Sequence, residues 1–253
     1  MDFSISIPIV ALAFACELVD SGLGMGYGTI LTPVLLLLGY EPVEIVPAVL
    51  LSEFITGLTA GIAHHEFGNL NLNRGSRDFK VTFLLAGLSL IGVVGAVAIA
   101  ISVPVWVIKV YIGILVLAIG VSILLLRSRQ LSFCWRRVSG LGVLAAFNKG
   151  ISGGGYGPVV TGGLVLSGVG SRNAVGMTSL AESVTSALGV LGYYLATRAQ
   201  IPWHLAPSLL MGALLSVPLA AYAVSRLPHK RLKLAIGGTT TILGCWTLVK
   251  VLL

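Results

Sequence analysis

Apolar residues fill long stretches of the sequence, and polar residues gather in the short segments between them. A helix that crosses a bilayer needs about 20 mostly apolar residues. Three stretches in each half of the chain meet this length: residues 44–65, 80–101 and 104–126, and then residues 173–195, 204–226 and 230–252. The pattern therefore predicts three membrane-crossing helices in each half.

A different unit precedes each set of three. It consists of two apolar segments around a Gly-rich break, residues 3–20 and 29–39 in the first half and 138–149 and 157–168 in the second. A helix of about 11 residues rises only about 16 Å, which is about half the hydrocarbon thickness. We therefore expect each unit to be a re-entrant hairpin of two short helices, which enters and leaves the membrane on the same side.

The composition indicates a membrane protein. Of the 253 residues, 56% are hydrophobic and only 10% are charged, and the mean hydropathy is +0.99. A soluble domain carries about 25% charged residues, because its surface must be hydrated. This shortage of charge excludes a soluble enzyme, a disordered protein and a nucleic-acid binder. We expect a multi-pass protein of the plasma (inner) membrane.

The distribution of basic residues favours the hairpin topology, because cytoplasmic loops carry an excess of Lys and Arg. If each hairpin returns to its own side, one side of the membrane holds only Lys109, Arg198 and Lys250. The other side holds Arg74, Arg77, Lys80, Arg127, Arg129, Arg136, Arg137, Arg172, Arg226, Lys230, Arg231 and Lys233. The excess of basic residues behind the net charge of +7 therefore indicates how the chain is oriented in the membrane. It predicts an outside N-terminus and a cytoplasmic segment 127–137.

The two halves of the sequence resemble each other. Aligned without a gap, Gly24, Gly26, Tyr27, Gly28, Thr32, Leu35, Gly39, Glu53 and Thr56 match Gly153, Gly155, Tyr156, Gly157, Thr161, Leu164, Gly168, Glu182 and Thr185. Three net crossings in each half invert one half relative to the other, an arrangement that recurs in transporters. We predict an all-α polytopic membrane protein with two inverted-topology repeats, each a hairpin followed by three transmembrane helices. The repeats are residues 1–126 and 138–253, joined by the basic linker 127–137.

The Gly-rich breaks are the first candidate for chemistry. Unwound backbone at membrane depth survives only where protein or a water-filled cavity satisfies its polar groups, and glycine lets a ligand approach the main chain. The second helix of each hairpin would present its N–H groups and positive dipole end, which favours an anion. The alternative is that the glycines only allow tight helix packing. The expected ligand contacts are the backbone of Gly24, Gly26, Tyr27, Gly28, Thr29, Gly153, Gly154, Gly155, Tyr156 and Gly157, and the hydroxyls of Thr32 and Thr161.

Charged residues at membrane depth are the second candidate, because they are costly and usually face a pathway or each other. Lys149 lies just before the second break, beside Asn148, and its repeat equivalent is Asp20. One hypothesis is an Asp20–Lys149 ion pair between the hairpin tips. The other is that Lys149 supplies a fixed charge for an anion, with Asn148 as a further donor and Asp20 as a proton or ion partner.

Glu53 and Glu182 form a second matched pair, each with a threonine three residues later on the same helix face. They could accept protons during transport, or hold the hairpin by accepting hydrogen bonds from amides of the Gly-rich loops. Glu17, one turn before Asp20, is a weaker candidate for the same network.

His64 and His65 are adjacent, and adjacent helical side chains point about 100° apart, which disfavours a shared metal ion. We predict an interfacial position at a helix end, with a proton relay as the alternative. No metal or cofactor site is expected.

The duplicated segments Gly24-x-Gly26-Tyr27-Gly28-x-x-x-Thr32-Pro33 and Gly153-Gly154-Gly155-Tyr156-Gly157-Pro158 resemble the TauE/SafE family of sulfite or organosulfonate exporters. The length, the duplication and the basic central loop extend the resemblance over essentially the whole chain. It implies export of a small sulfur-containing anion, coupled to protons or another ion such as Na⁺. Met25 replaces one glycine of the first break, so the two breaks are not expected to contribute equally.

The resulting prediction is a secondary active transporter that alternates access around the two breaks. A passive anion channel with the same site is the alternative, and a membrane-embedded enzyme is a weaker one. The substrate is expected to be a small anion, and the assembly is left open between a monomer and a homodimer.

Overall fold

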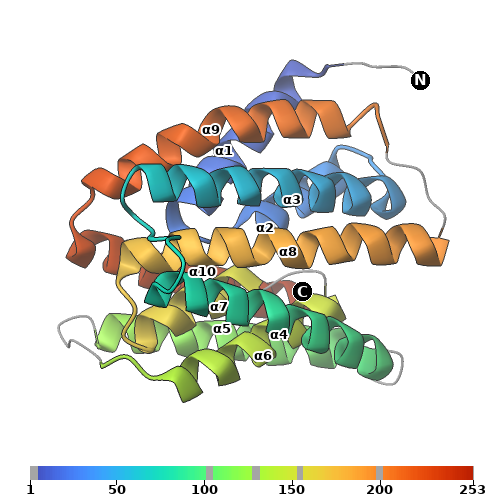
Figure 1. Cartoon of the computed structure of the whole chain (residues 1–253). Coiled ribbons are helices and arrows are strands. Elements are labelled where there is room, and N and C mark those ends of the chain that lie inside the picture. The colour runs from blue at the N-terminus through green and yellow to red at the C-terminus, as the bar shows by residue number, and fades with distance from the viewer. Residues whose placement is uncertain (1–4, 101–104, 127–131, 153–155, 198–201, 253) are drawn as a thin grey trace.

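A computed structural model describes residues 5–100, 105–126, 132–152, 156–197 and 202–252, and the regular elements of these residues are all α-helices (Figure 1). The helices are α1 (Ile7–Leu23), α2 (Tyr27–Leu37), α3 (Pro42–Glu66), α4 (Arg77–Ala100), α5 (Val105–Leu125), α6 (Trp135–Ser152), α7 (Tyr156–Leu166), α8 (Ser171–Thr197), α9 (Ala206–Arg226) and α10 (His229–Leu252).

Several helices match the predicted membrane crossings. Within the described residues, four helices are long and apolar enough to cross a membrane: α3, α8, α9 and α10. With 24 and 21 residues, α4 and α5 follow the predicted segments 80–101 and 104–126, and residues 101–104 lie outside the described part. The regular structure of the described residues is therefore all α-helical, and its long apolar helices indicate a multi-pass membrane protein.

The outer surface agrees with this assignment. The side chain of Leu37 is 87% exposed and that of Leu125 is 78% exposed, whereas Lys149, Asn148 and His64 are buried. Apolar groups outside and hydrogen-bonded polar groups inside are what a bilayer environment requires.

The two breaks are shorter than predicted, because the helices before them end later and the helices after them begin earlier than expected. α1 continues through Gly22 to Leu23, and α6 has 18 residues and continues to Ser152, so α6 is longer than the expected short helix. α2 and α7 have 11 residues each, as expected for the short arms. The first break is set by Gly24 and Gly26, whose φ angles of 72° and 126° suit glycine only.

Each hairpin begins and ends at one end of the molecule. Before α1, the Ser6 amide donates to Ser208 Oγ at the start of α9 (3.0 Å), and Tyr40, after α2, stacks on His204 just before α9. At the opposite end, the Cys134 amide before α6 donates to the Ser167 carbonyl after α7 (3.1 Å).

Basic side chains gather at that opposite end, where they hold helix C-termini. Arg137 donates to the Leu166 carbonyl (2.7 Å), Arg172 to the Leu227 carbonyl (2.6 Å) and Lys233 to the Leu126 carbonyl (2.9 Å). Cations are favourable there because the last carbonyls of a helix lack intrahelical partners. These contacts join segments that the sequence analysis assigned to one side. Which side of the membrane this end faces remains a prediction.

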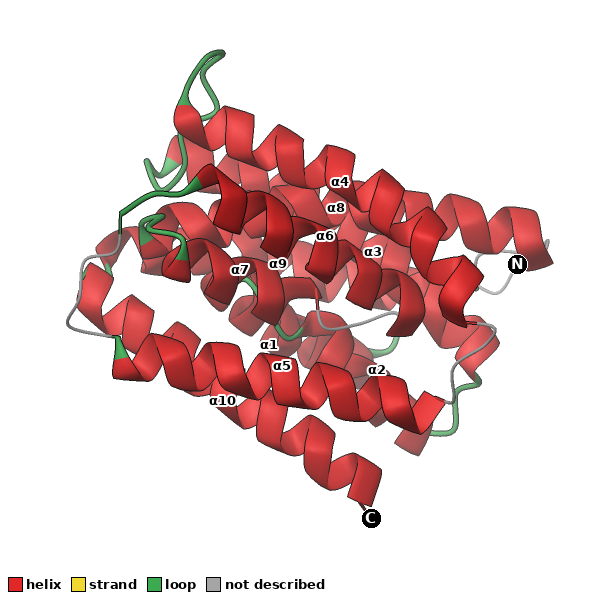
Figure 2. Cartoon of the chain, turned by 90° about the horizontal axis from the view of Figure 1, so that it is seen from below, coloured by secondary structure: helices red, strands yellow, loops and turns green. Residues whose placement is uncertain are grey.

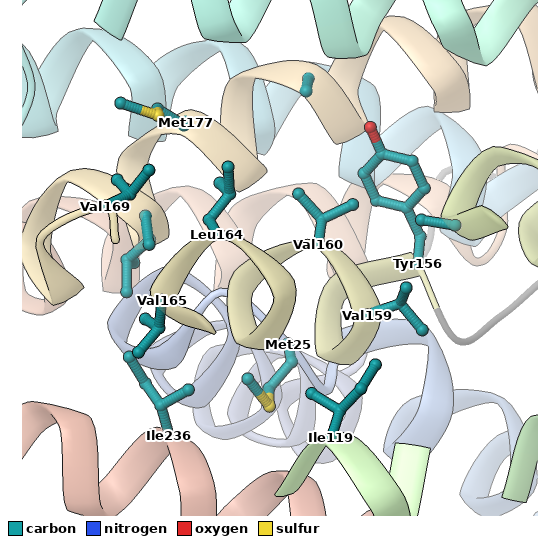
Figure 3. Close-up of a cluster of buried hydrophobic side chains, with 14 of the residues drawn as sticks. Met25, Ile119, Tyr156, Val159, Val160, Leu164, Val165, Val169, Met177 and Ile236 are labelled. Atoms are coloured by element: carbon teal, nitrogen blue, oxygen red, sulfur yellow. The ribbon is translucent and has the colours of Figure 1, made fainter. Parts of the chain in front are cut away.

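The helices are packed as a row with a second group beside it. Each member of the series α1, α9, α3, α8, α4, α6 packs along the next, and α5 packs along α10 (Figures 1 and 2). The short arm α7 lies inside, whereas α2 buries the face that carries Tyr27, Leu31 and Leu35 and exposes Leu36 and Leu37. One buried cluster surrounds α7 and includes Val160, Leu164, Ile236 and Met25, the residue that departs from the glycine pattern (Figure 3). A second cluster surrounds α2 and includes Leu31 and Leu209.

The hairpin tips touch each other through glycine. A Cβ atom on Gly157, in the first turn of α7, would lie 2.6 Å from the Gly24 carbonyl oxygen and 2.9 Å from Met25 Cα. The Thr161 hydroxyl, one turn further along α7, donates to the same Gly24 carbonyl (2.8 Å). Because the neighbours at Gly157 are backbone atoms, they cannot move aside as a flexible side chain would.

The contact predicts that Gly157→Ala destabilises the protein by about 1–3 kcal/mol through overpacking. Gly22→Ala is the matched control, because a Cβ atom there meets nothing within 4 Å and replacing glycine inside a helix stabilises it by about 0.5–1 kcal/mol. Thermal unfolding of both purified variants in detergent measures the difference. Equal melting temperatures would contradict the close contact.

Candidate functional site

The most buried ion pairs of the described residues lie next to the second break. Lys149 Nζ, near the end of α6, lies 3.0 Å from Glu53 Oε2 on α3 and 2.7 Å from Glu182 Oε1 on α8. The three side chains are 6%, 9% and 13% exposed. Ser186 Oγ donates to the same Glu53 oxygen (3.0 Å), and Lys149 Nζ lies 5.9 Å from the Tyr156 ring centroid. One ammonium group therefore ties α6 to both α3 and α8.

Of the two hypotheses for Asp20 and Lys149, the direct ion pair between them is not formed in this structure. Asp20 Oδ1 accepts a hydrogen bond from the Tyr27 amide (3.1 Å), the first residue of α2, so this carboxylate caps the helix that follows the first break. Lys149 instead has two glutamates as partners, because a buried ammonium needs close opposite charge. The alignment of the repeats matched the two positions but did not determine their contacts.

Glu53 and Glu182 both contact the second hairpin through Lys149, a contact that the sequence did not predict. Within the described residues, their hydrogen-bond donors are the Lys149 ammonium and the Ser186 hydroxyl. The Gly-loop amides expected as donors include residues 153–155, which lie outside the described part of the chain.

A small cavity lies at this meeting point, with room for about one water molecule in this conformation. It is lined by Asp20, Gly26, Tyr27, Gly28, Thr29, Glu53, Lys149, Tyr156, Gly157, Pro158 and Glu182. The first turns of α2 and α7 both belong to this lining. Gly28 allows the close approach of Glu53, since a Cβ atom there would lie 2.9 Å from Glu53 Oε1. The structure thus brings together most of the residues proposed from the sequence.

Other candidates lie elsewhere. Thr161 is fully buried in the joint between the hairpins, and its hydroxyl is bonded to the Gly24 carbonyl. Asn148 is also fully buried, and Thr32 is half-buried on the second turn of α2. Gly24, Thr32, Asn148 and Thr161 are not among the described lining residues, and Gly153, Gly154 and Gly155 lie outside the described part.

The charges around the cavity are unequal. Lys149 is the one cation of the described lining, and Asp20, Glu53 and Glu182 are carboxylates. The N-termini of α2 and α7 add partial positive charge, but Asp20 already occupies the first amide of α2. With every carboxylate ionised, the lining repels a free anion. Anion entry therefore requires that protons or cations neutralise carboxylates, or that a carboxylate leaves Lys149.

The predicted interfacial position of His64 is wrong. His64 does lie in the last turn of α3, but its side chain is fully buried. Its Nε2 lies 2.9 Å from the Ser21 carbonyl and its Nδ1 lies 3.1 Å from Asn69 Nδ2. Because helices pack around the end of α3, His64 joins α1 to the α3–α4 loop. His65 is half-buried and bonds the Leu70 carbonyl (3.0 Å).

Glu17, the weaker candidate of the sequence analysis, is the centre of a second buried hydrogen-bond network. Glu17 is 2% exposed and accepts from Ser21 Oγ (2.5 Å), one turn along α1. The spacing of four residues between Glu17 and Ser21 is the signal that could have revealed it. In the described residues, no group of three or more His, Cys, Asp or Glu side chains is arranged to hold a metal ion.

Comparisons with known proteins agree with this architecture. The family model described as sulfite exporter TauE/SafE matches residues 9–247. A probable membrane transporter protein, YtnM of Bacillus subtilis (strain 168), is 27% identical over 245 residues, covering 92% of this chain and 79% of that protein. No solved structure matches the chain. The chain therefore belongs to the sulfite exporter TauE/SafE family of membrane transporters, which are not enzymes.

Proposed function

We propose that the protein is a secondary active exporter of a small sulfur-containing anion, such as sulfite or an organosulfonate. The observation that carries the proposal is the buried Lys149, held by Glu53 and Glu182 beside a cavity between two helix N-termini. A cation and N–H groups at membrane depth suit an oxyanion. The family description supports sulfite as a substrate, and an organosulfonate carries the same charged group.

We also propose that the chain consists of two inverted repeats, residues 1–126 and 138–253, around the linker 127–137. The packing order supports this proposal. In the row α1, α9, α3, α8, α4, α6, replacing each helix by its equivalent in the other repeat gives the same row in reverse. The pair α5 and α10 is likewise formed by equivalent helices. In this proposal the two hairpins enter from opposite sides and meet at the cavity, where access alternates.

The unequal charges suggest how the anion is bound. Glu53 and Glu182 occupy Lys149 as internal anions, so the substrate competes with them for the ammonium. Protonation of either carboxyl weakens its hold on Lys149, which makes the ammonium available. Anion binding and proton binding then favour each other, so the anion and the proton cross the membrane together. Net export then requires an outward anion gradient that exceeds any opposing proton gradient. Asp20, Glu53 and Glu182 are the proposed coupling groups, and Na⁺ is the other ion to be tested.

The first prediction concerns Lys149. Wild-type protein should be stabilised against heat by one of sulfite, sulfoacetate, taurine, thiosulfate, sulfate or acetate, because a ligand at 100 times its Kd adds about 2.7 kcal/mol to the native state. Lys149→Met should lose that response and should also lose about 3–5 kcal/mol of stability, because it leaves buried carboxylates uncompensated. Lys250→Met, at an exposed position in the last turns of α10, is the control for charge.

The double variant Lys149→Met/Glu182→Gln separates folding from binding, because it removes the cation together with one of its carboxylate partners. It should fold more stably than Lys149→Met and still show no anion response. An anion response in either variant would show that Lys149 is not needed to bind the anion. No response of the wild-type protein to any of the six anions would contradict the proposed substrate class.

The second prediction concerns Glu182→Gln. If the substrate competes with carboxylates for Lys149, wild-type affinity should rise as pH falls. In Glu182→Gln one competitor is permanently neutral, so affinity at neutral pH should exceed that of wild type and change less with pH. Binding titrations at a series of pH values measure this, with Glu41→Gln, at an exposed position before α3, as the control. Equal pH profiles for Glu182→Gln and wild type would contradict the competition.

The third prediction distinguishes a transporter from a passive channel. Proteoliposomes with an imposed pH step should accumulate the identified anion above its external concentration, and dissipation of the step by a protonophore should abolish the accumulation. Downhill flux alone would indicate a channel. Accumulation that depends on a Na⁺ gradient and not on the pH step would show that Na⁺ is the coupling ion in place of the proton.

A further inference from the structure

We infer that Glu17 is a neutral carboxylic acid that holds a bound proton beside the cavity, and that it carries the coupling proton; the second statement rests on the proposed function. Glu17 is a site separate from the Lys149 cluster. It lies on α1, it is 2% exposed, and it is not among the described residues that line the cavity.

No cation neutralises Glu17 within the described part of the chain. The salt bridges there join Lys149 to Glu53 and Glu182, and His204 to Glu44. A carboxylate that is fully ionised, buried and unpaired is among the most unfavourable groups in a protein, and such a group normally binds a proton instead. Its neighbours must then provide hydrogen bonds that suit the acid.

The hydrogen bonds around Glu17 fit the protonated form. Ser21 Oγ donates to Glu17 Oε1 (2.5 Å), and Thr56 Oγ1 lies 3.3 Å from Glu17 Oε2. The Thr56 hydroxyl has one hydrogen, and the carbonyl of Ser52 lies closer to it, at 2.8 Å. If Thr56 donates to that carbonyl, its oxygen is free to accept. All three groups are satisfied when Glu17 Oε2 carries a proton and donates it to Thr56.

The same chain of groups leads to the cavity. Ser52, whose carbonyl accepts from Thr56, places its hydroxyl 2.8 Å from the Tyr27 hydroxyl. Tyr27 belongs to the described lining of the cavity and begins α2. The proton site and the substrate cavity therefore share the wall formed by α1, α2 and α3.

The charged groups that surround Glu17 are mainly acidic. On its own helix Cys16 and Asp20 are neighbours, α2 brings Tyr27, and α3 brings Glu53 and, at the Ser21 carbonyl, His64. Glu182 of α8 lies further off in the cavity lining, where its charge faces Lys149. α9 carries no titratable side chain before Tyr222, in its last turns, and α10 meets the first break through Thr240 and Met25, which do not titrate. His64 is bonded to the Ser21 carbonyl and does not pair with Glu17. Loss of the proton would therefore add a negative charge to a cluster that has one buried lysine.

The second repeat lacks this site. The position equivalent to Glu17 is Ala146, which is fully buried, and the equivalent of Thr56 is Thr185. Thr185 Oγ1 contacts Ser89 Oγ at 2.8 Å, so its hydroxyl has a neutral partner. The packing of this helix position thus does not require a carboxyl group, and Glu17 introduces one in the first repeat alone.

These observations give the proton a role in transport. A proton on Glu17 removes a charge near Asp20 and Glu53, so the anion enters a less negative site. Release of that proton restores the repulsion and favours release of the anion. Each binding event strengthens the other, as linkage requires, and one proton moves with each anion through this site.

The test uses Glu17→Gln in proteoliposomes. A glutamine amide can donate to Thr56 and accept from Ser21, so the variant reproduces the protonated acid and should fold. It should equilibrate the anion without accumulating it, and the proton flux that accompanies anion entry should be lost. Glu66→Gln, at an exposed position at the end of α3, is the matched control and should accumulate like wild type. Glu17→Asp should recover part of the accumulation, because it restores a titratable group.

Infrared difference spectroscopy tests the bound proton independently of transport. The wild-type protein at neutral pH should show the carbonyl band of a protonated carboxylic acid, shifted in D₂O, and Glu17→Gln should lack it. An unchanged band in Glu17→Gln, or full pH-driven accumulation by that variant, overturns the inference. If the wild-type protein shows the band and its loss in Glu17→Gln but moves none of the anions, the bound proton stands, while the proposed function and the coupling role both fail.

Discussion

The neutralisation of one buried ammonium group organises the centre of this protein. Lys149 lies where α6 ends, and its charge is shared between Glu53 of α3 and Glu182 of α8. At membrane depth an uncompensated ion is so unfavourable that the end of α6 is tied to both helices through this side chain. The joint of the two hairpin tips, where Gly157 meets the Gly24 carbonyl, lies beside this cluster around the same cavity.

The same interaction determines how an anion can enter. The site holds its own carboxylates on the ammonium and on the first amide of α2, so it is filled by internal anions in this conformation. In the proposed mechanism a substrate binds by replacing these contacts, and the energy of replacement depends on protonation. Binding and proton uptake are in this way parts of one equilibrium. Glu17 extends the equilibrium to a neighbouring site that has hydroxyl partners in place of a cation.

Sequence reasoning succeeded where local composition decides the outcome. The apolar stretches located the long helices, and the Gly-rich segments located the breaks to within a few residues. It failed where contacts between distant segments decide. Asp20 and Lys149 are equivalent in the alignment of the two halves, yet one caps α2 and the other binds two glutamates. Thr161 matches Thr32, yet its hydroxyl closes the hairpin joint.

The sequence by itself determined the class of protein, the helices, the breaks and the family resemblance, because hydrophobic length and glycine act on short segments of chain. Only the tertiary structure decided which carboxylates neutralise Lys149, why Thr161 is absent from the described cavity lining, and that His64 is buried. Those outcomes depend on which helices pack together. Buried charge is stabilised by the nearest opposite charge in space, and the distances between α3, α6 and α8 are not encoded in any one of them.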